Sequence, residues 1–373
     1  MSAKSNDSFK KKTFSSHACK TNKNTKITAE KKYFSSLCNI LEKIQFSYFS
    51  DLTKKDVHDI FYNVTQQYKD TLGRVLNTKN KDYNMKVIVN DIKTPINDEK
   101  IVIGKKVGEG AAGIVYKGYF DMVGKTLDSV VIKENFQGTA HSDAVELLIQ
   151  TYLYCIARDK KGKKVYIPKP MYAARHKKKR YIVLEPMQST LEDELMFKEN
   201  ETSEQHFKRI KGYLITICET LKFFQDKCKF VHGDLHVGNI MFKNSIPYVI
   251  DFGRSSLVIN GNRQHGDQDF LWEYSPSVDL IALYSTIADE LEYQGFGDCK
   301  TYKFCHKYVD KFYKKVLETP IKSLDKKYLP FRRVYDSGDC ELKWHMLVLG
   351  EKVFDVVEPD FVPKNALKIL KDI

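Results

Sequence analysis

The chain has 373 residues, of which 42% are hydrophobic, 22 are Tyr and 22 are Phe, so it can bury a sizeable core and is not disordered as a whole. Its formal net charge of +13 is unevenly spread, because residues 1–97 hold 18 Lys or Arg against 9 Asp or Glu. No apolar run approaches the roughly 20 residues that a membrane helix requires, which argues against a membrane partner.

The first segment, residues 1–29, is rich in Ser, Asn, Thr and Lys and is predicted to be a basic disordered tail. Residues 30–97 are predicted to form a helical extension and a linker. Two stripes of apolar residues recur at three- and four-residue steps within 30–76, and 87–89 read as a short strand. Such a basic region can contact nucleic acid, but solvated positive charge is the commoner explanation, and a nucleic-acid role is not favoured.

From about residue 99, short β-branched runs alternate with glycines, which is typical of strands joined by hairpins. The predicted strands are 101–103, 113–116, 129–133 and 181–184, followed or interrupted by an amphipathic helix at 145–156. The remainder is predicted to be largely helical, at 203–227, 277–292, 301–317 and 341–357, apart from strand pairs near 240 and 249. This order predicts an α+β, two-lobed domain over 98–373, with a β-rich N-lobe at about 98–187 and a helical C-lobe at about 188–373.

A glycine-rich turn lies between the first two of these strands. The turn and its flanks are Val107, Gly108, Glu109, Gly110, Ala111, Ala112, Gly113, Ile114 and Val115. A turn with so few side chains lets backbone N–H groups approach phosphate oxygens closely. The same glycine spacing marks dinucleotide sites, but there the glycines open a helix, whereas here a strand continues. An ordinary hairpin with several glycines remains the alternative.

Lys133 ends the third strand, and Glu146 lies in the first turns of the helix that follows. A carboxylate at that position can pair with the lysine ammonium and hold it against the α- and β-phosphates of a nucleotide. A strand lysine more often points to water, and Glu146 can instead be a charge that suits a helix N-terminus. Local evidence leaves these interpretations open.

Two polar motifs carry the strongest signal, at residues 232–239 (HGDLHVGN) and 251–253 (DFG). Phosphoryl transfer needs a carboxylate to orient the attacking hydroxyl, and acidic or amide oxygens to hold magnesium between phosphates. Magnesium prefers one or two carboxylates together with phosphate oxygens and water. Asp234, Asn239 and Asp251 supply these groups, and a chance collection of polar turn residues does not account for both motifs.

These residues resemble those of the protein-kinase superfamily, in the family's order, from about residue 99 to about 295. The glycine loop is matched, the V-A-I-K pattern appears as 130–133, H-R-D-L-x-x-x-N as 232–239, and D-F-G is intact. The resemblance implies a bilobal fold, which the helical extension predicted above precedes. It also implies a kinase that uses ATP with Mg²⁺, or Mn²⁺ as the alternative ion.

The resemblance also implies a role for each matching residue. Asp234 becomes the catalytic base, Lys133 the phosphate-binding cation with Glu146 as its partner, and Asn239 and Asp251 the metal ligands. Glu185 and Met187 resemble the hinge that bonds adenine through backbone groups. Asp279 resembles the aspartate that anchors the catalytic loop from below.

Three departures from the family pattern bear on the substrate. Gly233 replaces the arginine that receives a phosphorylated activation loop, His236 stands where protein-serine kinases usually have a lysine that steadies the transferred phosphate, and no A-P-E triplet occurs between 253 and 279. The H-G-D-L-H-x-G-N motif also resembles aminoglycoside and choline phosphotransferases, which phosphorylate small alcohols.

Those relatives generally lack so complete a glycine loop and an intact D-F-G, so a divergent serine/threonine protein kinase acting on a protein substrate is favoured. The richness in Lys, Asn, Tyr and Ile resembles kinases of large DNA viruses. A catalytically dead binding module is the third class, but no catalytic residue is missing.

Eight cysteines occur without any Cys-x-x-Cys pair, which predicts reduced thiols. Together with an N-terminus unlike a signal peptide, they indicate an intracellular, cytoplasmic protein, in the host cytoplasm or the virion if viral. Residues 177–180 (KKKR) are predicted to form a solvated hairpin turn. Ser255, Ser256 and Ser275 are weak phosphorylation candidates.

Overall fold

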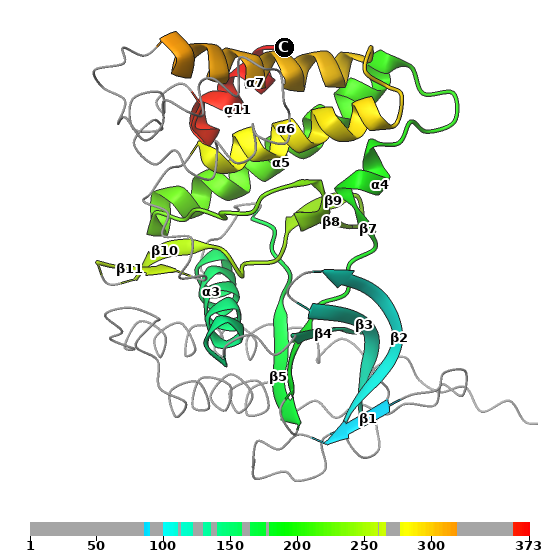
Figure 1. Ribbon diagram of the computed structural model, residues 1–373, viewed down its shortest axis with the longest axis vertical. Coiled ribbons are helices and arrows are strands. Elements are labelled where there is room, and N and C mark those ends of the chain that lie inside the picture. Colours follow the sequence, from blue (N-terminus) through cyan, green and yellow to red (C-terminus); the bar gives the residue numbers. More distant parts are fainter. Residues whose placement is uncertain are drawn as a thin grey trace, which may run out of the picture.

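The computed structural model describes residues 86–89, 100–110, 113–121, 130–135, 140–158, 165–176, 179–259, 261–265, 277–318 and 361–373. The predicted tail, the two helices within 30–76 and the helix at 341–357 lie outside these residues. Strands gather at one end of the molecule and the helices α5, α6, α7 and α11 at the other (Figure 1). The predicted α+β, two-lobed arrangement is therefore confirmed.

The N-lobe is a six-stranded sheet in which every neighbouring pair is antiparallel, in the order β1-β2-β3-β4-β6-β5. Its strands are β1 (Lys86–Val89), β2 (Lys100–Gly110), β3 (Gly113–Asp121), β4 (Val130–Asn135), β5 (Pro170–His176) and β6 (Lys179–Leu184). The short strand predicted at 87–89 is present as β1 and pairs with the first part of β2. β2 continues well beyond the predicted 101–103, because its glycines pair with β3 across register shifts near Lys106.

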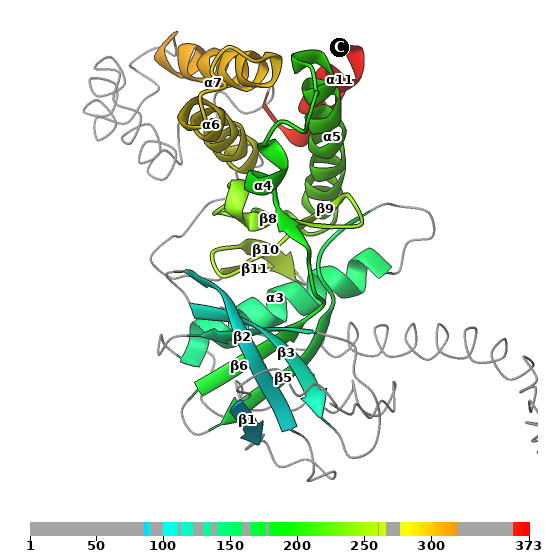
Figure 2. The same cartoon turned by 90° about the vertical axis from the view of Figure 1, so that its right-hand side faces the viewer.

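Helix α3 (Ala140–Arg158) packs beside the sheet against β5 (Figure 2). The sequence predicted one apolar face, but every residue from 146 to 155 is buried. Leu147, Leu148, Ile149 and Leu153 are at most 1% exposed. A helix buried on more than one face cannot rotate or slide without exposing apolar surface. α3 therefore holds Glu146, which lies in its N-terminal half, in a fixed place.

The C-lobe is built from α4 (Leu191–Leu195), α5 (Ser203–Cys228), α6 (Val278–Tyr293), α7 (Lys300–Glu318) and α11 (Pro363–Asp372). α5 packs against α7 and α11, and α6 packs against α7. α5 begins with a reciprocal capping box between Thr202 and Gln205, which satisfies two backbone N–H groups of the first turn. Among the described residues, no helix is both long and apolar enough to span a membrane.

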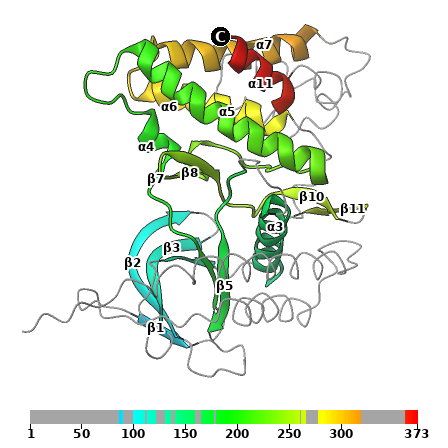
Figure 3. The ribbon, with the colours of Figure 1, turned by 180° about the vertical axis from the view of Figure 1, so that it is seen from behind.

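Short strands lie between the lobes (Figure 3). β7 (Ser189–Thr190), β8 (Ile240–Lys243) and β9 (Ile246–Val249) form one sheet, and β10 (Ser256–Ile259) and β11 (Asn262–His265) form another. The strand pairs predicted near 240 and 249 correspond to β8 and β9, whereas β10 and β11 were not predicted. A single 3₁₀ turn, η2 (Val237–Asn239), precedes β8. Both chemical motifs therefore lie at the junction of the lobes.

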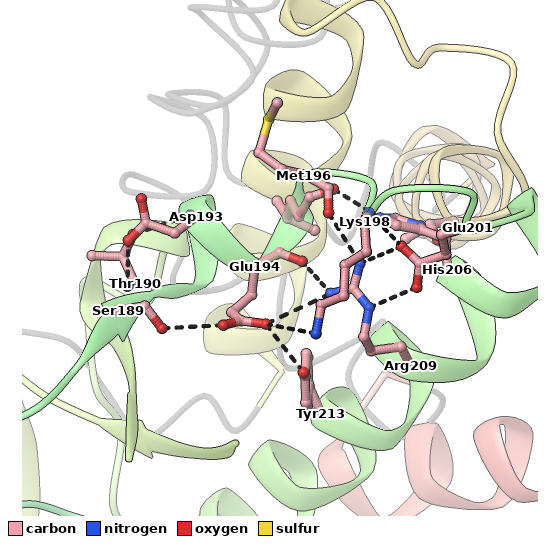
Figure 4. A network of polar contacts seen from close by, with 12 residues as sticks. Ser189, Thr190, Asp193, Glu194, Met196, Lys198, Glu201, His206, Arg209 and Tyr213 are labelled. Atoms are coloured by element: carbon pink, nitrogen blue, oxygen red, sulfur yellow. Dashed lines mark hydrogen bonds and ion pairs between the residues drawn. The ribbon is translucent and has the colours of Figure 1, made fainter. Parts of the chain in front are cut away.

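A polar network ties α4 to α5 (Figure 4). The guanidinium of Arg209 binds both carboxylate oxygens of Glu201, at 2.8 and 2.7 Å, and donates to the carbonyl oxygens of Glu194 and Met196. Tyr213 donates to the carboxylate of Glu194 at 3.2 Å. A planar guanidinium suits such a fork-like arrangement, so one arginine fixes the chain between the two helices.

Candidate active site

The 232–239 loop follows α5 and is held by α6. The carboxylate of Asp279 accepts hydrogen bonds from the backbone N–H groups of His232, at 2.8 Å, and Gly233, at 3.0 Å. Asp279 is 1% exposed, and burial raises the pKa of its carboxyl even though these contacts oppose the rise. Gly233 has φ = 77°, a left-handed conformation that glycine adopts without steric cost. The residue that replaces the family's arginine is therefore the one that this backbone turn favours.

His232 links this loop to the segment that contains Asp251. Its Nε2 lies 2.8 Å from the carbonyl oxygen of Ile250, and its Nδ1 lies 3.3 Å from the backbone nitrogen of Asp234. Because a carbonyl oxygen only accepts, we assign the proton to Nε2, and Nδ1 accepts from the N–H group of Asp234. Phe252 packs against the imidazole, with 5.6 Å between ring centroids. One imidazole thus fixes the spacing of the two motifs.

Asp234, the predicted base, lies within the 232–239 loop. Its carbonyl oxygen accepts a hydrogen bond from Nδ2 of Asn239 at 2.7 Å. Its carboxylate is 24% exposed, and Oδ1 lies 3.1 Å from Nη1 of Arg254. Within the described part of the chain, Oδ2 has no hydrogen-bond or ion-pair partner. The carboxylate is therefore held at one oxygen and accessible at the other.

Asp251 adopts φ = 60°, which is uncommon for a residue with a side chain and costs of order 1 kcal/mol. Its Oδ1 accepts from the ammonium of Lys133 at 3.1 Å and from the N–H group of Gly253 at 3.4 Å. Burial would raise the pKa of this carboxyl, but the Lys133 ammonium outweighs burial, and the pKa is lowered. Backbone strain is common at functional sites, and here it turns a carboxylate toward β4.

Lys133 and Glu146 form the buried ion pair that the sequence left open. Nζ of Lys133 on β4 lies 2.7 Å from Oε1 of Glu146 on α3, and the two residues are 8% and 4% exposed. Burial alone would lower the pKa of the lysine, but Glu146 and Asp251 together raise it. Lys133 therefore does not point to water, and Glu146 is not merely a charge at a helix end.

The glycine-rich turn is the hairpin between β2 and β3. Its register pairs Gly108 with Val115, Glu109 with Ile114 and Gly110 with Gly113. Val115 lies opposite Lys133 in the neighbouring strand pair, so the hairpin adjoins the buried cation. Glu109 is exposed and forms an ion pair with Lys106. Its carboxylate is thus paired within β2.

The tip of this hairpin, Ala111 and Ala112, lies outside the described residues. Val107 is 48% exposed. An apolar side chain that packs on a ligand would be exposed in this way, but single exposed apolar residues are also common. A Cβ on Gly108 would come no closer than 4.0 Å to another atom, so steric crowding does not demand glycine there. The structure thus places the hairpin next to Lys133.

The predicted hinge follows β6 and leads into β7. The N–H group of Glu185 donates to the carbonyl oxygen of Lys169 at 3.0 Å, and its carboxylate pairs with Lys243. In the part of the chain that the structure describes, the Glu185 carbonyl and the backbone groups of Met187 make no hydrogen bond. These are the groups that a planar base could bond.

His236 differs from the lysine that the family pattern suggests. Its Nδ1 accepts the N–H group of Gly238 at 3.1 Å, which caps the η2 turn. A Cβ on Gly238 would lie 2.9 Å from Cε1 of His236, so the ring occupies the space that glycine leaves open. Burial lowers the pKa of His236, although Asp234 opposes the shift. The imidazole supports the loop rather than supplying a fixed positive charge.

Two other sequence predictions can be placed. Ser255 and Ser256 are 0% and 1% exposed, and the Ser255 hydroxyl donates to the carbonyl oxygen of His232 at 3.0 Å, so phosphorylation of either would require local opening. Ser275 lies outside the described residues. His176 pairs with Lys179 in the register of β5 and β6. Residues 179–180 of the predicted turn belong to β6, where Lys179 pairs with Glu134, and residues 177–178 lie outside the described residues.

Asn239 and Asp251 offer oxygen ligands for a divalent ion. The amide nitrogen of Asn239 is engaged by Asp234, and Oδ2 of Asp251 has no partner among the residues described. Carboxylate and amide oxygens suit Mg²⁺ and Mn²⁺. The described residues contain no cluster of three or more His, Cys, Asp or Glu that could cage a metal, and nucleotide-bound magnesium needs none. The donor set fits such an ion.

Lys133, Asp251 and Asp234 lie together at the junction of the two lobes. A buried lysine, a strained aspartate and an accessible carboxylate are the groups that phosphoryl transfer requires. Residues 101–275 match the family model described as the protein kinase domain. Residues 101–275 therefore form a protein-kinase-like domain, which confirms the predicted resemblance. No curated protein matches the chain.

Proposed function

We propose that this kinase transfers the γ-phosphoryl group of ATP to serine or threonine hydroxyls of a protein. The observation that carries the proposal is the simultaneous contact of Lys133 with Glu146, at 2.7 Å, and with Asp251, at 3.1 Å, in the same junction as the accessible carboxylate of Asp234. Phosphoryl transfer depends on positioning and electrostatics more than on covalent chemistry. These contacts supply both before any substrate binds.

Asp234 would take up the proton of the acceptor hydroxyl at Oδ2, the oxygen without a partner among the described residues. As the proton leaves, the hydroxyl oxygen bonds to the γ-phosphorus, the bond from that phosphorus to the β,γ-bridging oxygen breaks, and ADP departs. Lys133, fixed by Glu146, would bind the α- and β-phosphates. Asn239 and Asp251 would hold Mg²⁺, which supplies positive charge between the phosphates.

The remaining predicted residues would bind the nucleotide through their backbone. The Glu185 carbonyl and the backbone groups of Met187 would bond the adenine, since they have no partner in the described part of the chain. The β2–β3 hairpin, with Gly110 opposite Gly113, would approach the phosphates. Side-chain substitutions at Glu109, which is exposed and faces Lys106, are then expected to affect ATP affinity little.

A small-molecule acceptor is the second candidate, and the sequence around Asp234 favours it. Gly233 and His236 stand where protein kinases usually have cationic side chains, and the segment between 253 and 279 lacks the A-P-E triplet. The H-G-D-L-H-x-G-N motif, which contains Gly233 and His236, also resembles that of phosphotransferases that act on aminoglycosides or choline. A protein acceptor is favoured by the complete glycine hairpin and the intact D-F-G.

Labelled ATP separates these acceptors. The full chain is incubated with magnesium and either basic and acidic protein substrates or a panel of amino-alcohols, and phosphoamino-acid analysis identifies the labelled residue. Asp234→Asn is the control, because loss of a general base lowers turnover by about a hundredfold or more. Label in phosphoserine or phosphothreonine supports the proposal. Label confined to the amino-alcohols would reject it in favour of the second candidate.

A cytoplasmic location is part of the proposal. It is supported by the five cysteines within the described residues, all of them buried free thiols: Cys155, Cys218, Cys228, Cys299 and Cys305. Buried thiols of this kind suit a reducing compartment. Fractionation of cells that express the tagged chain tests it, and recovery in a membrane or secreted fraction would contradict it.

A further inference from the structure

Arg254 immediately follows the D-F-G segment and contacts the predicted base. Its Nη1 lies 3.1 Å from Oδ1 of Asp234, and the two side chains are 43% and 24% exposed. In the family pattern, the arginine that Gly233 replaces here receives a phosphorylated activation loop. An arginine on the base itself is a different feature, because it acts on the carboxylate that takes up the proton.

The backbone on either side of Arg254 is fixed to the 232–239 loop. Ser255 donates its hydroxyl to the carbonyl oxygen of His232 at 3.0 Å, and its N–H group to the carbonyl oxygen of Phe252 at 3.1 Å. Ser256 and Val231 exchange two backbone hydrogen bonds, at 2.9 and 2.8 Å. Because Ser255 and Ser256 are buried, these bonds are shielded from water. The backbone next to Arg254 is therefore held in place by hydrogen bonds, and this fixes the position of Arg254 beside Asp234.

His236 stands where the family pattern has a lysine, but its imidazole is engaged within the 232–239 loop. His236 accepts the N–H group of Gly238 at Nδ1, so that nitrogen carries no proton and the ring cannot be a cation in this arrangement. The ring also packs over Gly238, where a Cβ would lie 2.9 Å from Cε1. The 232–239 loop thus offers no cation to its own base.

We propose that Arg254 is a positioning residue for phosphoryl transfer, taking the place of the lysine that the loop lacks. Its guanidinium binds Oδ1 of Asp234 and so directs Oδ2 toward the acceptor hydroxyl. The inference rests on the proposed function, since it concerns the same proton transfer from the acceptor to Asp234. Arg254 itself forms and breaks no covalent bond.

Stability should be nearly independent of this contact. A partly exposed ion pair contributes little to folding, and Arg254 is not part of the buried core. Truncating it therefore isolates the effect on catalysis. Arg263 on β11 provides a matched control, because it is an arginine nine positions further along that donates to Ser256 at 3.1 Å and lies outside the proposed machinery.

The experiment measures kcat, KM for ATP and the thermal midpoint for Arg254→Ala, Arg254→Lys, Arg254→Ala with His236→Lys, and Arg263→Ala. Misplacement of a reacting group costs about a hundredfold. We therefore expect kcat of Arg254→Ala to fall by ten- to about a hundredfold, with KM for ATP and the midpoint unchanged. Either lysine-bearing variant should recover most of the loss, and Arg263→Ala should behave as wild type.

Several outcomes would overturn the inference while leaving the proposed function intact. If the wild type is active and Arg254→Ala matches it, Arg254 has no role in transfer. A rise in kcat would mean that Arg254 covers the base and inhibits it. If both lysine-bearing variants stay as slow as Arg254→Ala, the positive charge is not what matters. A wild type that labels no acceptor would reject the proposed function and this inference with it.

Discussion

Arg209 in the C-lobe and Lys133 in the N-lobe are both cations held away from water by carboxylates, yet the two networks end differently. Arg209 is 13% exposed, and its donors go to Glu201, Glu194 and Met196 within the same lobe (Figure 4). Hydrogen bonds from Arg209 hold the pKa of Glu201 at about 2. Donors and acceptors match within the protein, so this network is closed.

The network around Lys133 is open by comparison. An ammonium has three donors, and two of them reach Glu146 and Asp251. Oδ2 of Asp251 and Oδ2 of Asp234 have no partner in the described part of the chain. Buried polar groups in proteins are normally satisfied. Unused capacity at a partly buried cluster therefore marks where a ligand completes the bonding, whereas a closed network marks a structural joint.

Breaking the open network should affect activity and stability together. For Lys133→Ala we expect turnover to fall at least about a hundredfold, because a preorganised cation at the phosphates is lost. The free energy of unfolding should fall by about 3 kcal/mol, because the buried carboxylate of Glu146 loses the ammonium that balances its charge. Steady-state kinetics and denaturant unfolding measure the two effects.

A second substitution separates the two losses. Adding Glu146→Ala to Lys133→Ala removes the buried carboxylate that lost its ammonium partner, so part of the stability should return while turnover stays low. Recovery of turnover in the double variant would contradict the assignment of Lys133 to the phosphates.

Breaking the closed network should affect stability alone. Arg209→Ala is expected to lower the free energy of unfolding by about 3 kcal/mol, since it leaves Glu201 unpaired. Turnover per folded molecule should change by less than about threefold, because no donor of Arg209 faces the junction. Arg209→Lys is the matched control and should lose part of the stability, since lysine cannot form the two-point contact. A lower kcat of fully folded Arg209→Ala would contradict this separation, because it would show that the Arg209 network also affects catalysis.

The closed network also predicts a pH dependence. His206 is buried against Phe197, accepts from Thr301 at 2.7 Å through Nδ1, and donates to the Leu195 carbonyl at 2.8 Å through Nε2. Burial lowers its pKa, with Glu201 opposing, so the unfolded chain binds a proton at higher pH than the folded chain. Stability from this site is complete above about pH 6.5 and declines as the pH falls below it.

Unfolding by denaturant between pH 5 and 8 measures this decline. The matched variant His206→Gln cannot titrate, so its stability should vary less with pH over that range. Parallel curves for the two proteins would show that the dependence comes from other groups.

The smallest effect is expected at the surface. Lys300 and Glu204 form an ion pair at 2.7 Å, but their side chains are 45% and 70% exposed. Lys300→Ala should change the free energy of unfolding by less than about 1 kcal/mol and leave turnover unaltered. A larger loss would point to the packing of the Lys300 ammonium over Phe207, where it lies 4.9 Å from the ring centroid.

The parts of this fold that sequence predicted well are those with local causes. α5 was expected at 203–227 and spans Ser203–Cys228, because its apolar residues recur at helical spacing and Thr202 caps its start. The pairing of Lys133 with Glu146 could be proposed, since only thirteen residues separate them. α4 was missed because its five residues are too few to show a period.

What sequence could not predict depends on contacts between distant segments. Arg254 reaches Asp234 only because β10 is bonded to the start of the loop, through the bridge between Val231 and Ser256. The same pairing buries Ser255, which looks like an exposed turn serine in the sequence. Neither residue type nor spacing carries this information, because it arises from the register of two short strands.

The packing of His236 over Gly238 has an evolutionary consequence. A side chain at 238 would collide with the imidazole, and moving the imidazole would give up the hydrogen bond to the 238 N–H group. A single substitution at position 238 is therefore expected to disturb the 232–239 loop, whereas a paired change at 236 and 238 can avoid the clash. A lineage that gained lysine at 236 would free position 238 to vary and would relax the demand for a cation at 254. Residues 236, 238 and 254 of this kinase are thus expected to change together during evolution.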